Sequence, residues 1–159
     1  MPTTAHPRVG EPAPDFTAET DANEPLTLSS LRGRPVVLYF YPRDDTDGCT
    51  AEACGFRDLF PRLAAADAVV LGVSPDAAGS HARFRKKYGL PFTLVADPDH
   101  RVAEAYGVWA EKRMFGRTYM GVERTTFLVD RGGRVARVFE KVRPAGHAEA
   151  VAAAVAELG

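Results

Sequence analysis

Two cysteines lie five residues apart in the segment GCTAEACGF, and they are the side chains of this sequence best suited to nucleophilic chemistry: Cys49 and Cys54. Cys49 follows the turn PRDDTDG and is spaced from Ala53 and Phe56 like residues on one helix face. Unpaired amides and the dipole at a helix N-terminus favour an anion, so a thiolate is favoured at Cys49. Position alone leaves the alternative of a small core residue open.

Cys54 makes a redox function the stronger interpretation. In an intact helix, residues five apart are separated by about 7.5 Å along the axis and about 140° around it. A disulfide needs Cα atoms within about 7 Å, so bonding Cys49 to Cys54 requires the helix between them to unwind. Little side-chain packing opposes this unwinding, because the residues between and beside the cysteines are small: Ala51, Ala53 and Gly55. Gly55 also weakens the helix. The spacing also differs from the CxxC of thiol-disulfide exchangers.

Strands and helices alternate around this site. Short apolar runs predict strands, and spacings of three and four predict helices. We expect strands at 36–41, 68–74 and 92–96, helices at 48–60, 80–88 and 97–107, a hairpin of 125–130 with 134–140 around RGG, and a last helix at 145–158. Pro61 should kink or end the first helix. Asp97 or Asp99 should cap the third helix, which Gly107 should stop.

This order predicts the α/β class, with a central mixed β-sheet flanked by helices on both faces, as in the thioredoxin-like fold. A flavodoxin-like sheet stays open on pattern alone. The length of 159 residues and a hydrophobic content of 45% predict a single domain over 1–159. Residues 1–15, rich in Pro and Thr, are expected to form an extended N-terminal arm.

Composition narrows the function classes. The chain carries 20 basic and 21 acidic residues, a net charge of -1, so we expect no nucleic-acid partner and no membrane partner. No apolar run approaches the length of about 20 residues that spans a bilayer, and no leader pattern opens the chain. We therefore expect a cytoplasmic protein, in which any disulfide would be transient chemistry.

Other candidate ligands and patches give weaker signals. The histidines are scattered over expected loops and helix starts, which favours solvated surface positions: His6, His81, His100 and His147. A zinc site at the cysteines would need two further ligands that the spacing does not supply. An aromatic and Met-rich stretch is expected to be core or a subunit contact: Trp109, Met114, Phe115, Tyr119 and Met120.

The segment PRDDTDGC resembles a known signature. Pro42, Thr46 and Cys49 resemble the proline, threonine and cysteine of peroxiredoxins, and Cys54 five residues later resembles the bacterioferritin comigratory protein branch, or Q type. The similarity covers almost the whole chain, including GVSPD, FTLVAD and YGVWAEKRMFGRTYMGVERTTFLVD. The combination of these motifs is highly specific.

The resemblance implies a role for each matching residue. Cys49 would be the peroxidatic cysteine, which becomes a sulfenic acid, and Cys54 the resolving cysteine, which condenses with it. Thr46 would hydrogen-bond the thiolate and the peroxide, and Pro42 would shield the pocket from water. Arg124 would stabilise the thiolate and the charge that develops on the breaking O–O bond. Glu52 would orient an arginine or the threonine.

The resemblance also implies a function: a thiol peroxidase that reduces hydrogen peroxide and organic hydroperoxides, with an intramolecular disulfide recycled by thioredoxin or a similar dithiol. No cofactor and no metal are expected. A monomer suffices for this cycle, and a weak dimer stays open. The alternatives are a redox sensor or a thiol-disulfide exchange protein that uses the same cysteine pair. Thr46 and Arg124 favour the peroxidase, because a sensor needs only two thiols.

One position departs from the branch. Its members often carry proline directly before the Gly-Cys pair, where this chain has Asp47. Aspartate can cap a helix, but its negative charge opposes a thiolate nearby. The departure puts the rate of Cys49 in question and removes none of the matching catalytic groups. The preferred peroxide, the reductant and the sensitivity to over-oxidation are not determined by the sequence.

Overall fold

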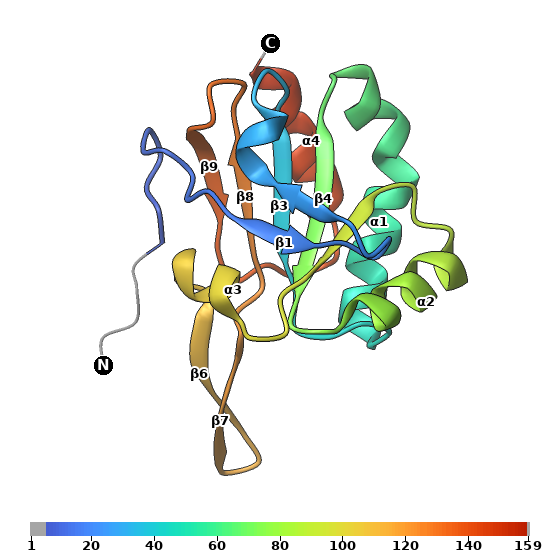
Figure 1. The fold of residues 1–159 in the computed structure, drawn as a ribbon, viewed down its shortest axis with the longest axis vertical. Helices are drawn as coiled ribbons and strands as arrows, with labels where there is room; N and C mark the ends of the chain where they lie inside the picture. The colour runs from blue at the N-terminus through green and yellow to red at the C-terminus, as the bar shows by residue number, and fades with distance from the viewer. Residues whose placement is uncertain (1–5, 159) are drawn as a thin grey trace.

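A five-stranded sheet forms the centre of the computed structural model, which describes residues 6–158 (Figure 1). The strands stand in the order β5-β4-β3-β8-β9: β5 (Thr93–Ala96), β4 (Val69–Ser74), β3 (Val36–Phe40), β8 (Thr125–Val129) and β9 (Val135–Phe139). β3, β4 and β5 run parallel, whereas β8 is antiparallel to both of its neighbours. The sheet is therefore mixed, as the sequence predicts.

β3 is the central strand, and all five of its residues are buried. Its alternate side chains enter two separate cores, because Val37 and Tyr39 pack on one face and Val36, Leu38 and Phe40 on the other. The sequence of a strand covered on both faces is typically a continuous apolar run, and the sequence of β3, VVLYF, is such a run. The carboxyl end of β3 leads directly into the loop that precedes Cys49.

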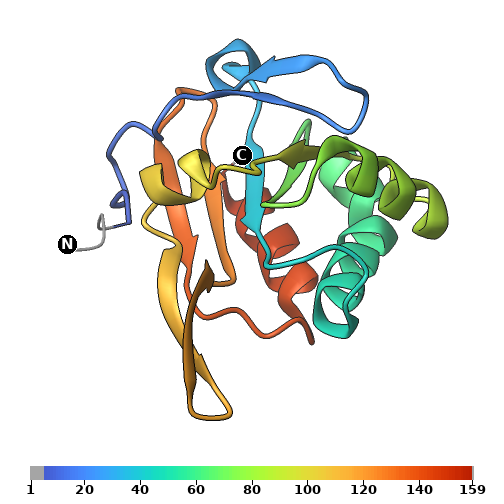
Figure 2. The same cartoon turned by 60° about the horizontal axis from the view of Figure 1, so that its bottom comes forward.

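Helices cover both faces of the sheet (Figures 1 and 2). On one face, α1 (Asp47–Ala65) packs against α4 (His147–Glu157), and α2 (Ala78–Tyr88) lies beside β5. The other face is covered by the short elements β1 (Thr17–Glu19), β2 (Pro25–Thr27), the 3-10 helix η1 (Leu28–Leu31) and α3 (Arg101–Ala105). This is the thioredoxin-like α/β arrangement that the sequence predicts.

α1 differs from the prediction at its C-terminal end. Pro61 was expected to kink or end this helix; the end is wrong, since the helix continues to Ala65 with Pro61 inside it, while the kink stays a prediction. Leu63, in the turn after Pro61, is buried in the core between α1 and the sheet. The packing of this turn outweighs the hydrogen bond that proline cannot make.

The N-terminus of α3 is capped by a side chain that lies outside the helix, before its N-cap residue. Its formal N-cap is His100, yet the Asp97 carboxylate accepts hydrogen bonds from the amides of Val102 and Ala103 at 3.0 and 2.9 Å. Asp97 is therefore the capping side chain, one of the two alternatives expected. The helix ends at Ala105, just before Gly107 with φ +69°.

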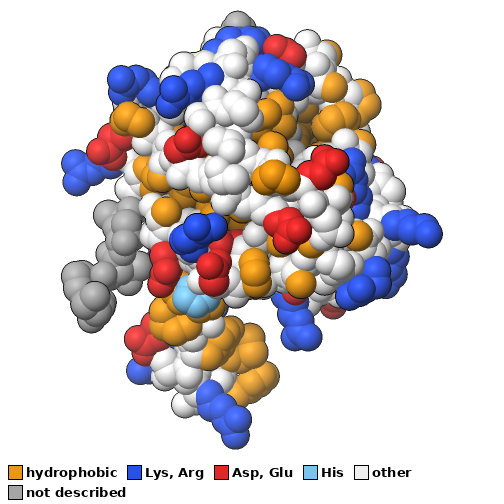
Figure 3. Space-filling model, viewed as in Figure 1, with side chains coloured by type: hydrophobic (Ala, Val, Ile, Leu, Met, Phe, Trp, Pro, Cys, Tyr) orange, Lys and Arg blue, Asp and Glu red, His pale blue; other side chains and the backbone are white. Residues whose placement is uncertain are grey.

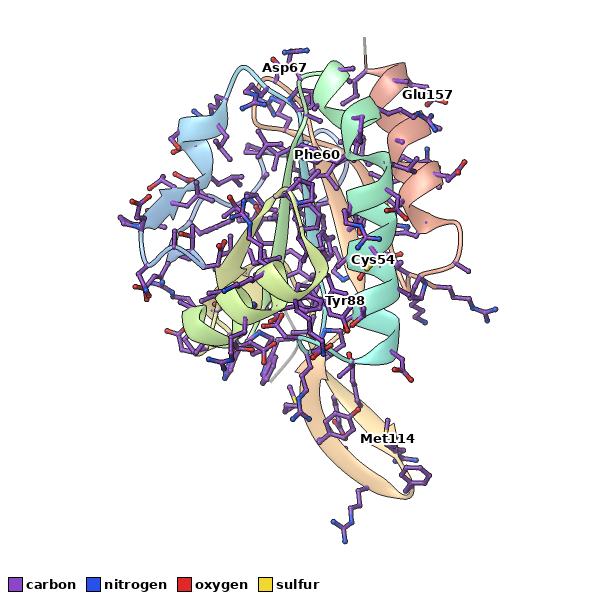
Figure 4. All side chains as sticks on the ribbon, turned by 90° about the vertical axis from the view of Figure 1, so that its right-hand side faces the viewer. Cys54, Phe60, Asp67, Tyr88, Met114 and Glu157 are labelled. Atoms are coloured by element: carbon purple, nitrogen blue, oxygen red, sulfur yellow. The ribbon has the colours of Figure 1, made fainter. Side chains whose placement is uncertain are left out.

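A two-stranded hairpin projects from the body of the molecule (Figures 1 and 3). It pairs β6 (Trp109–Met114) with β7 (Arg117–Val122). Its apolar side chains are exposed, so of the two expected places, core or subunit contact, the core is wrong for them and the subunit contact stays a prediction: Met114, Phe115, Tyr119 and Met120. Figure 4 shows Met114 near the tip, far from the sheet. Trp109, at the base, packs on the core.

The N-terminal segment lies along β9. The Gly10 amide donates to Val135, and Pro12 forms a bridge with Arg134. The expected arm at 1–15 falls partly outside the described residues, since residues 1–5 are not among them. None of the described helices is both long and apolar enough to cross a bilayer.

Candidate active site

Cys49 lies in the first turn of α1, two residues after the first residue of the helix. Thr46 is the N-cap residue, and Cys49 is 1% exposed. The amides of the first helical turn have no carbonyl partner within the helix, so they present partial positive charge to the buried sulfur. The position predicted from the sequence is confirmed.

Arg124 is a cation that contacts this sulfur directly. It lies between β7 and β8, and its Nη2 donates to Cys49 Sγ at 3.4 Å, while its Nη1 donates to Glu52 Oε1 at 2.7 Å. A planar guanidinium can make both contacts at once, which an ammonium group cannot do with the same geometry. Arg124 therefore connects the cysteine to Glu52, the acid one turn further along α1.

Gly48 leaves room for this arginine. A Cβ atom at residue 48 would lie 3.1 Å from Arg124 Nη2, closer than almost all ordinary Cβ contacts. The glycine before the cysteine thus permits the guanidinium to approach the helix N-terminus. A side chain at this position would require the guanidinium that contacts the sulfur to shift by a few tenths of an ångström.

Glu52 is a buried acid, only 1% exposed. Burial raises its pKa to about 7, although the Arg124 guanidinium opposes the shift. Its Oε1 accepts from Arg124, whereas its Oε2 has no hydrogen-bond partner among the described residues. A carboxyl group in this state is ionised and protonated in comparable amounts near neutral pH.

Pro42 and Thr46 lie in the loop between β3 and α1, and both are half-buried. The Thr46 hydroxyl donates to the Arg43 carbonyl at 3.0 Å, so its single proton is engaged within the loop in this conformation. Its lone pairs remain available as acceptors. The structure brings Cys49, Glu52 and Arg124 into direct contact, while Thr46 and Pro42 lie in the loop that precedes them.

A buried polar clamp fixes this loop to α2. The Asp44 carboxylate accepts hydrogen bonds from Tyr41 and Ser80 at 2.6 and 2.7 Å and lies 2.8 Å from His81 Nδ1. His81 Nε2 lies 2.9 Å from the Val95 carbonyl oxygen, and the imidazole is fully buried. The expected surface position of His81 is therefore wrong. Its contacts hold the loop in place beside Cys49.

The clamp also contains the described group of side chains that most resembles a metal site. Ligand atoms of Asp44, Asp76 and His81 lie within 4.8 Å of one another. However, Asp76 Oδ2 already accepts from the Asp44 amide and from Ser74, and both nitrogens of His81 face acceptors. These atoms are occupied by one another, which is the pattern of a structural network.

His147 is a second histidine whose expected surface position is wrong. It is the first residue of α4, is 7% exposed, and its Nε2 lies 2.8 Å from Thr126 Oγ1. Burial, followed by the Arg124 charge, lowers its pKa to about 4. A polar residue at the start of an amphipathic helix can face inward as easily as outward, so the sequence pattern alone does not place this side chain.

Lys112 adds a second cation to the site. It lies on β6, is half-buried, and its pKa is lowered by burial and by Arg124, while Cys49 opposes the shift. The ammonium group thus experiences the field of both Arg124 and Cys49 from the side of the hairpin. Sequence reasoning missed this residue, because only the pairing of β6 with β7 places it there.

Cys54 lies on the same helix as Cys49, is half-buried, and is not bonded to it. Figure 4 shows it on α1. The uninterrupted helix from Asp47 to Ala65 keeps the two thiols on different sides, at the separation of about 7.5 Å along the axis that five residues impose. In this conformation they cannot form a disulfide.

The arrangement supports nucleophilic attack by a thiolate. A helix N-terminus and a guanidinium stabilise negative charge on Cys49, and Arg124 can contact an incoming oxygen at the same time. A second thiol, Cys54, lies five residues further along the same helix.

Comparison with known proteins places the chain in a family. The model of the AhpC/TSA family matches residues 9–138. A putative peroxiredoxin Bcp of Coxiella burnetii is 53% identical over 139 residues, which cover 87% of this chain and 92% of that protein. Peroxiredoxin Bcp of Bacillus subtilis is 48% identical over 139 residues, with 87% and 88% covered.

Solved structures agree in fold. The bacterioferritin comigratory protein of Xanthomonas campestris, described for its alkyl peroxide reduction activity, superposes with a TM-score of 0.89 at 38% identity, covering 96% of this chain and 100% of that one. A mutant of peroxiredoxin Q from Xylella fastidiosa gives 0.91 at 34% identity, with 97% and 98% covered.

Proposed function

This chain belongs to the AhpC/TSA family and is a peroxiredoxin of the Bcp or Q type, and from this premise we propose that Cys49 reduces hydrogen peroxide and organic hydroperoxides. The observation that carries the proposal is the contact of Arg124 Nη2 with Cys49 Sγ at 3.4 Å, at the N-terminus of α1. Such a site has its positive charge in place before the reaction begins.

The first step forms one S–O bond and breaks one O–O bond. The Cys49 thiolate attacks one peroxide oxygen, the other oxygen leaves with the bonding electron pair, and a proton converts it to water or an alcohol. The sulfur is oxidised to a sulfenic acid and the peroxide is reduced. Arg124 stabilises negative charge first on sulfur and then on the leaving oxygen.

The remaining site residues support this step. Thr46, through its free lone pairs or after rotation of its hydroxyl, contacts the peroxide or the thiolate. Pro42 limits the access of water to the sulfur. Glu52 holds the second nitrogen of the Arg124 fork at 2.7 Å and so orients the first nitrogen toward Cys49.

The second step joins the two cysteines. The Cys54 thiolate attacks the Cys49 sulfenic sulfur, the S–O bond breaks, and the hydroxide takes up a proton and leaves as water, so that an intramolecular disulfide forms. Because the helix holds the thiols apart, the first turns of α1 unwind before this step. Exchange with a dithiol, either thioredoxin or a similar protein, then restores both thiols.

The cycle fits the cytoplasm, where thiols are kept reduced. It needs no second subunit, so a monomer suffices, although a weak dimer is compatible with it. An oxidised form that ran as a disulfide-linked dimer on a non-reducing gel would contradict the intramolecular step.

Steady-state peroxide consumption with thioredoxin and its reductase tests the function. The wild type should turn over, whereas Cys49→Ser should be inactive and Thr46→Val should be strongly impaired. Reduction of insulin disulfides with full peroxide inactivity would instead indicate an exchanger. A disulfide that forms only slowly with peroxide, at equal rates in wild type and Thr46→Val, would indicate a sensor.

A further inference from the structure

His81 is fully buried on α2, and both of its ring nitrogens face oxygen atoms. Nδ1 lies 2.8 Å from Asp44 Oδ2, and Nε2 lies 2.9 Å from the Val95 carbonyl oxygen. A carbonyl oxygen only accepts hydrogen bonds, so Nε2 needs a proton to bond with it. Nδ1 needs a proton as well if Asp44 is ionised, because a carboxylate also only accepts.

The surroundings of Asp44 favour its ionised form. Two hydroxyl groups point at the carboxylate, since Tyr41 donates to Oδ1 at 2.6 Å and Ser80 donates to Oδ2 at 2.7 Å. Burial raises the pKa of Asp44, but the hydrogen bond and charge of His81, together with the two hydroxyls, outweigh burial and hold the pKa below its usual value. The proton between Asp44 and His81 therefore belongs to Nδ1.

The titratable groups that face the imidazole come from three further segments. Asp44 approaches from the loop after β3, and Asp76 from the segment after β4, with ligand atoms of the three side chains within 4.8 Å of one another. The Tyr41 hydroxyl, at the end of β3, lies 3.4 Å from Nδ1. Burial, followed by Tyr39 and Asp44, raises the pKa of Tyr41 well above its usual value, so this phenol stays neutral. A positive imidazole thus faces two carboxylates.

The peptide group between Arg43 and Asp44 connects this network to Thr46. Its N–H, the Asp44 amide, donates to Asp76 Oδ2 at 2.8 Å, and its carbonyl oxygen, on Arg43, accepts from the Thr46 hydroxyl at 3.0 Å. A peptide group is planar, so a fixed amide also fixes the direction of the carbonyl. The position of the Thr46 hydroxyl therefore depends on how firmly Asp44 is held.

We propose that His81 is a positioning residue for Thr46, and that it acts as an imidazolium, with a proton on both ring nitrogens, ion-paired with the Asp44 carboxylate. The proposal relies on the proposed function only for the role of Thr46 in the reaction of Cys49. A neutral imidazole carries one proton. It would leave either the Val95 carbonyl facing a lone pair or the Asp44 carboxylate without its third donor.

The buried ion pair has the partners that such a pair requires. Two charges removed from water hold a stable geometry only when further hydrogen bonds satisfy their remaining atoms. Val95 accepts the second proton of the ring, while Tyr41 and Ser80 donate to the carboxylate. The side chain of Asp44 is thus held by α2 and by the end of β3 together, and its amide by Asp76.

¹⁵N nuclear magnetic resonance of the reduced wild type at pH 7.5 tests the protonation of the ring. Both ring nitrogens of His81, assigned by comparison with His81→Gln, should show the shift and the attached hydrogen of a protonated nitrogen. An ordinary imidazole is mostly neutral at this pH. His147 is the internal control, because burial, followed by the Arg124 charge, lowers its pKa to about 4, so its ring should carry one proton. A single proton on the His81 ring would overturn the proposal.

Amide hydrogen exchange tests the positioning without peroxide. The Thr50 amide donates to the Thr46 carbonyl at 2.7 Å, so its exchange reports whether Thr46 keeps its place. In His81→Gln the amides of Asp44 and Thr50 should exchange about tenfold faster, which corresponds to the loss of one charge-assisted hydrogen bond. His100→Gln, a matched change before α3 on the other face of the sheet, should leave both rates unchanged.

A second variant keeps the test open if His81→Gln does not fold. Ser80→Ala removes one donor to Asp44 and keeps the imidazole, so it should accelerate exchange of the same two amides by a smaller factor. Wild-type exchange rates in the foldable variants would overturn the positioning role.

Stopped-flow oxidation of Cys49 by hydrogen peroxide connects this role to the reaction. His81→Gln should slow the oxidation about tenfold when Thr46 is present and much less in the Thr46→Val background, where the positioned hydroxyl is absent. Equal slowing in both backgrounds would indicate general packing and overturn the proposal. Slow oxidation of the wild type, with a doubly protonated His81 and amide exchange that depends on it, would refute the peroxidase and support the positioning role. Fast oxidation with a singly protonated His81 would refute only the positioning role.

Discussion

Glu52→Gln should make the unfolding free energy of the reduced protein fall, relative to wild type, by about 2 kcal/mol as the pH decreases from 6.5 to 5. His147→Gln should produce a relative change of similar size and opposite sign. Both expectations come from the two buried groups that meet behind Arg124. Each group has a folded-state pKa displaced from its ordinary value, and the displacements are opposite.

The sign of the Glu52 contribution to the pH dependence of the unfolding free energy follows from the proton that the group loses on unfolding. Its pKa is about 7 in the folded protein against an ordinary value of 4.5. Between these limits the folded state keeps a proton that the unfolded state has lost, so Glu52 favours folding fully below pH 4.5 and loses this contribution as the pH rises through 7. The slope is about 1.4 kcal/mol per pH unit inside the window.

His147 acts in the reverse direction. Its pKa is about 4 in the folded protein against an ordinary value of 6.5. The unfolded state binds a proton that the buried imidazole does not, so stability is lost as the pH falls from 6.5 toward 4. In wild type the two slopes cancel between about pH 5 and 6.5, because folding moves one proton from the histidine to the glutamate without net release.

Urea denaturation of the reduced proteins at pH 5, 5.5, 6 and 6.5 measures these slopes. Subtracting the wild-type curve from each variant curve removes the contribution of groups distant from the substituted residue. Opposite slopes in the two difference curves are expected. Flat difference curves, or slopes of the same sign in both variants, would refute the assignment of displaced ionisation to Glu52 and His147.

Arg124→Met should slow the oxidation of Cys49 by hydrogen peroxide by about 10² to 10³, with Arg124→Lys in between, in single-turnover mixing experiments. Full reactivity in Arg124→Met would contradict the role of the guanidinium. Gly48→Ala should slow the same step about tenfold or more, because its Cβ would lie 3.1 Å from Arg124 Nη2, and a structure of the variant should show the arginine displaced. Ala51→Gly, at an exposed position between the cysteines, should weaken the helix by about 1 kcal/mol and speed disulfide formation with Cys54 about fivefold, while the oxidation of Cys49 is unchanged. Equal rates of disulfide formation would argue against unwinding as the limiting event.

Local patterns predicted the framework of the fold correctly. The run VVLYF is confirmed as the central strand, and the spacing of Cys49, Ala53 and Phe56 is confirmed as the buried face of α1. Both signals are strong because one strand is covered on two faces and one helix faces a single core. Of the kink or end predicted at Pro61, the end is wrong, because the burial of Leu63 is a tertiary effect that local chemistry does not report.

The candidate site, like the fold, was predictable only where local sequence patterns determine it. Cys49 and its helix position follow from local spacing, whereas the contact between Arg124 and Glu52 joins residues 72 apart in sequence. The resemblance to peroxiredoxins supplied those two residues. His81, His147 and Lys112 were missed as parts of the site, since only the packing of α2, α4 and the hairpin brings them to it.

The reaction of Cys49 with peroxide is tested most directly by stopped-flow mixing of the reduced wild type, Cys49→Ser and Cys54→Ser with hydrogen peroxide, with trapping of sulfenic acid. Rapid oxidation should be lost only in Cys49→Ser, and sulfenic acid should accumulate in Cys54→Ser. Oxidation at the slow rate of a free thiol in all three proteins would contradict the assignment of Cys49 as the peroxidatic cysteine.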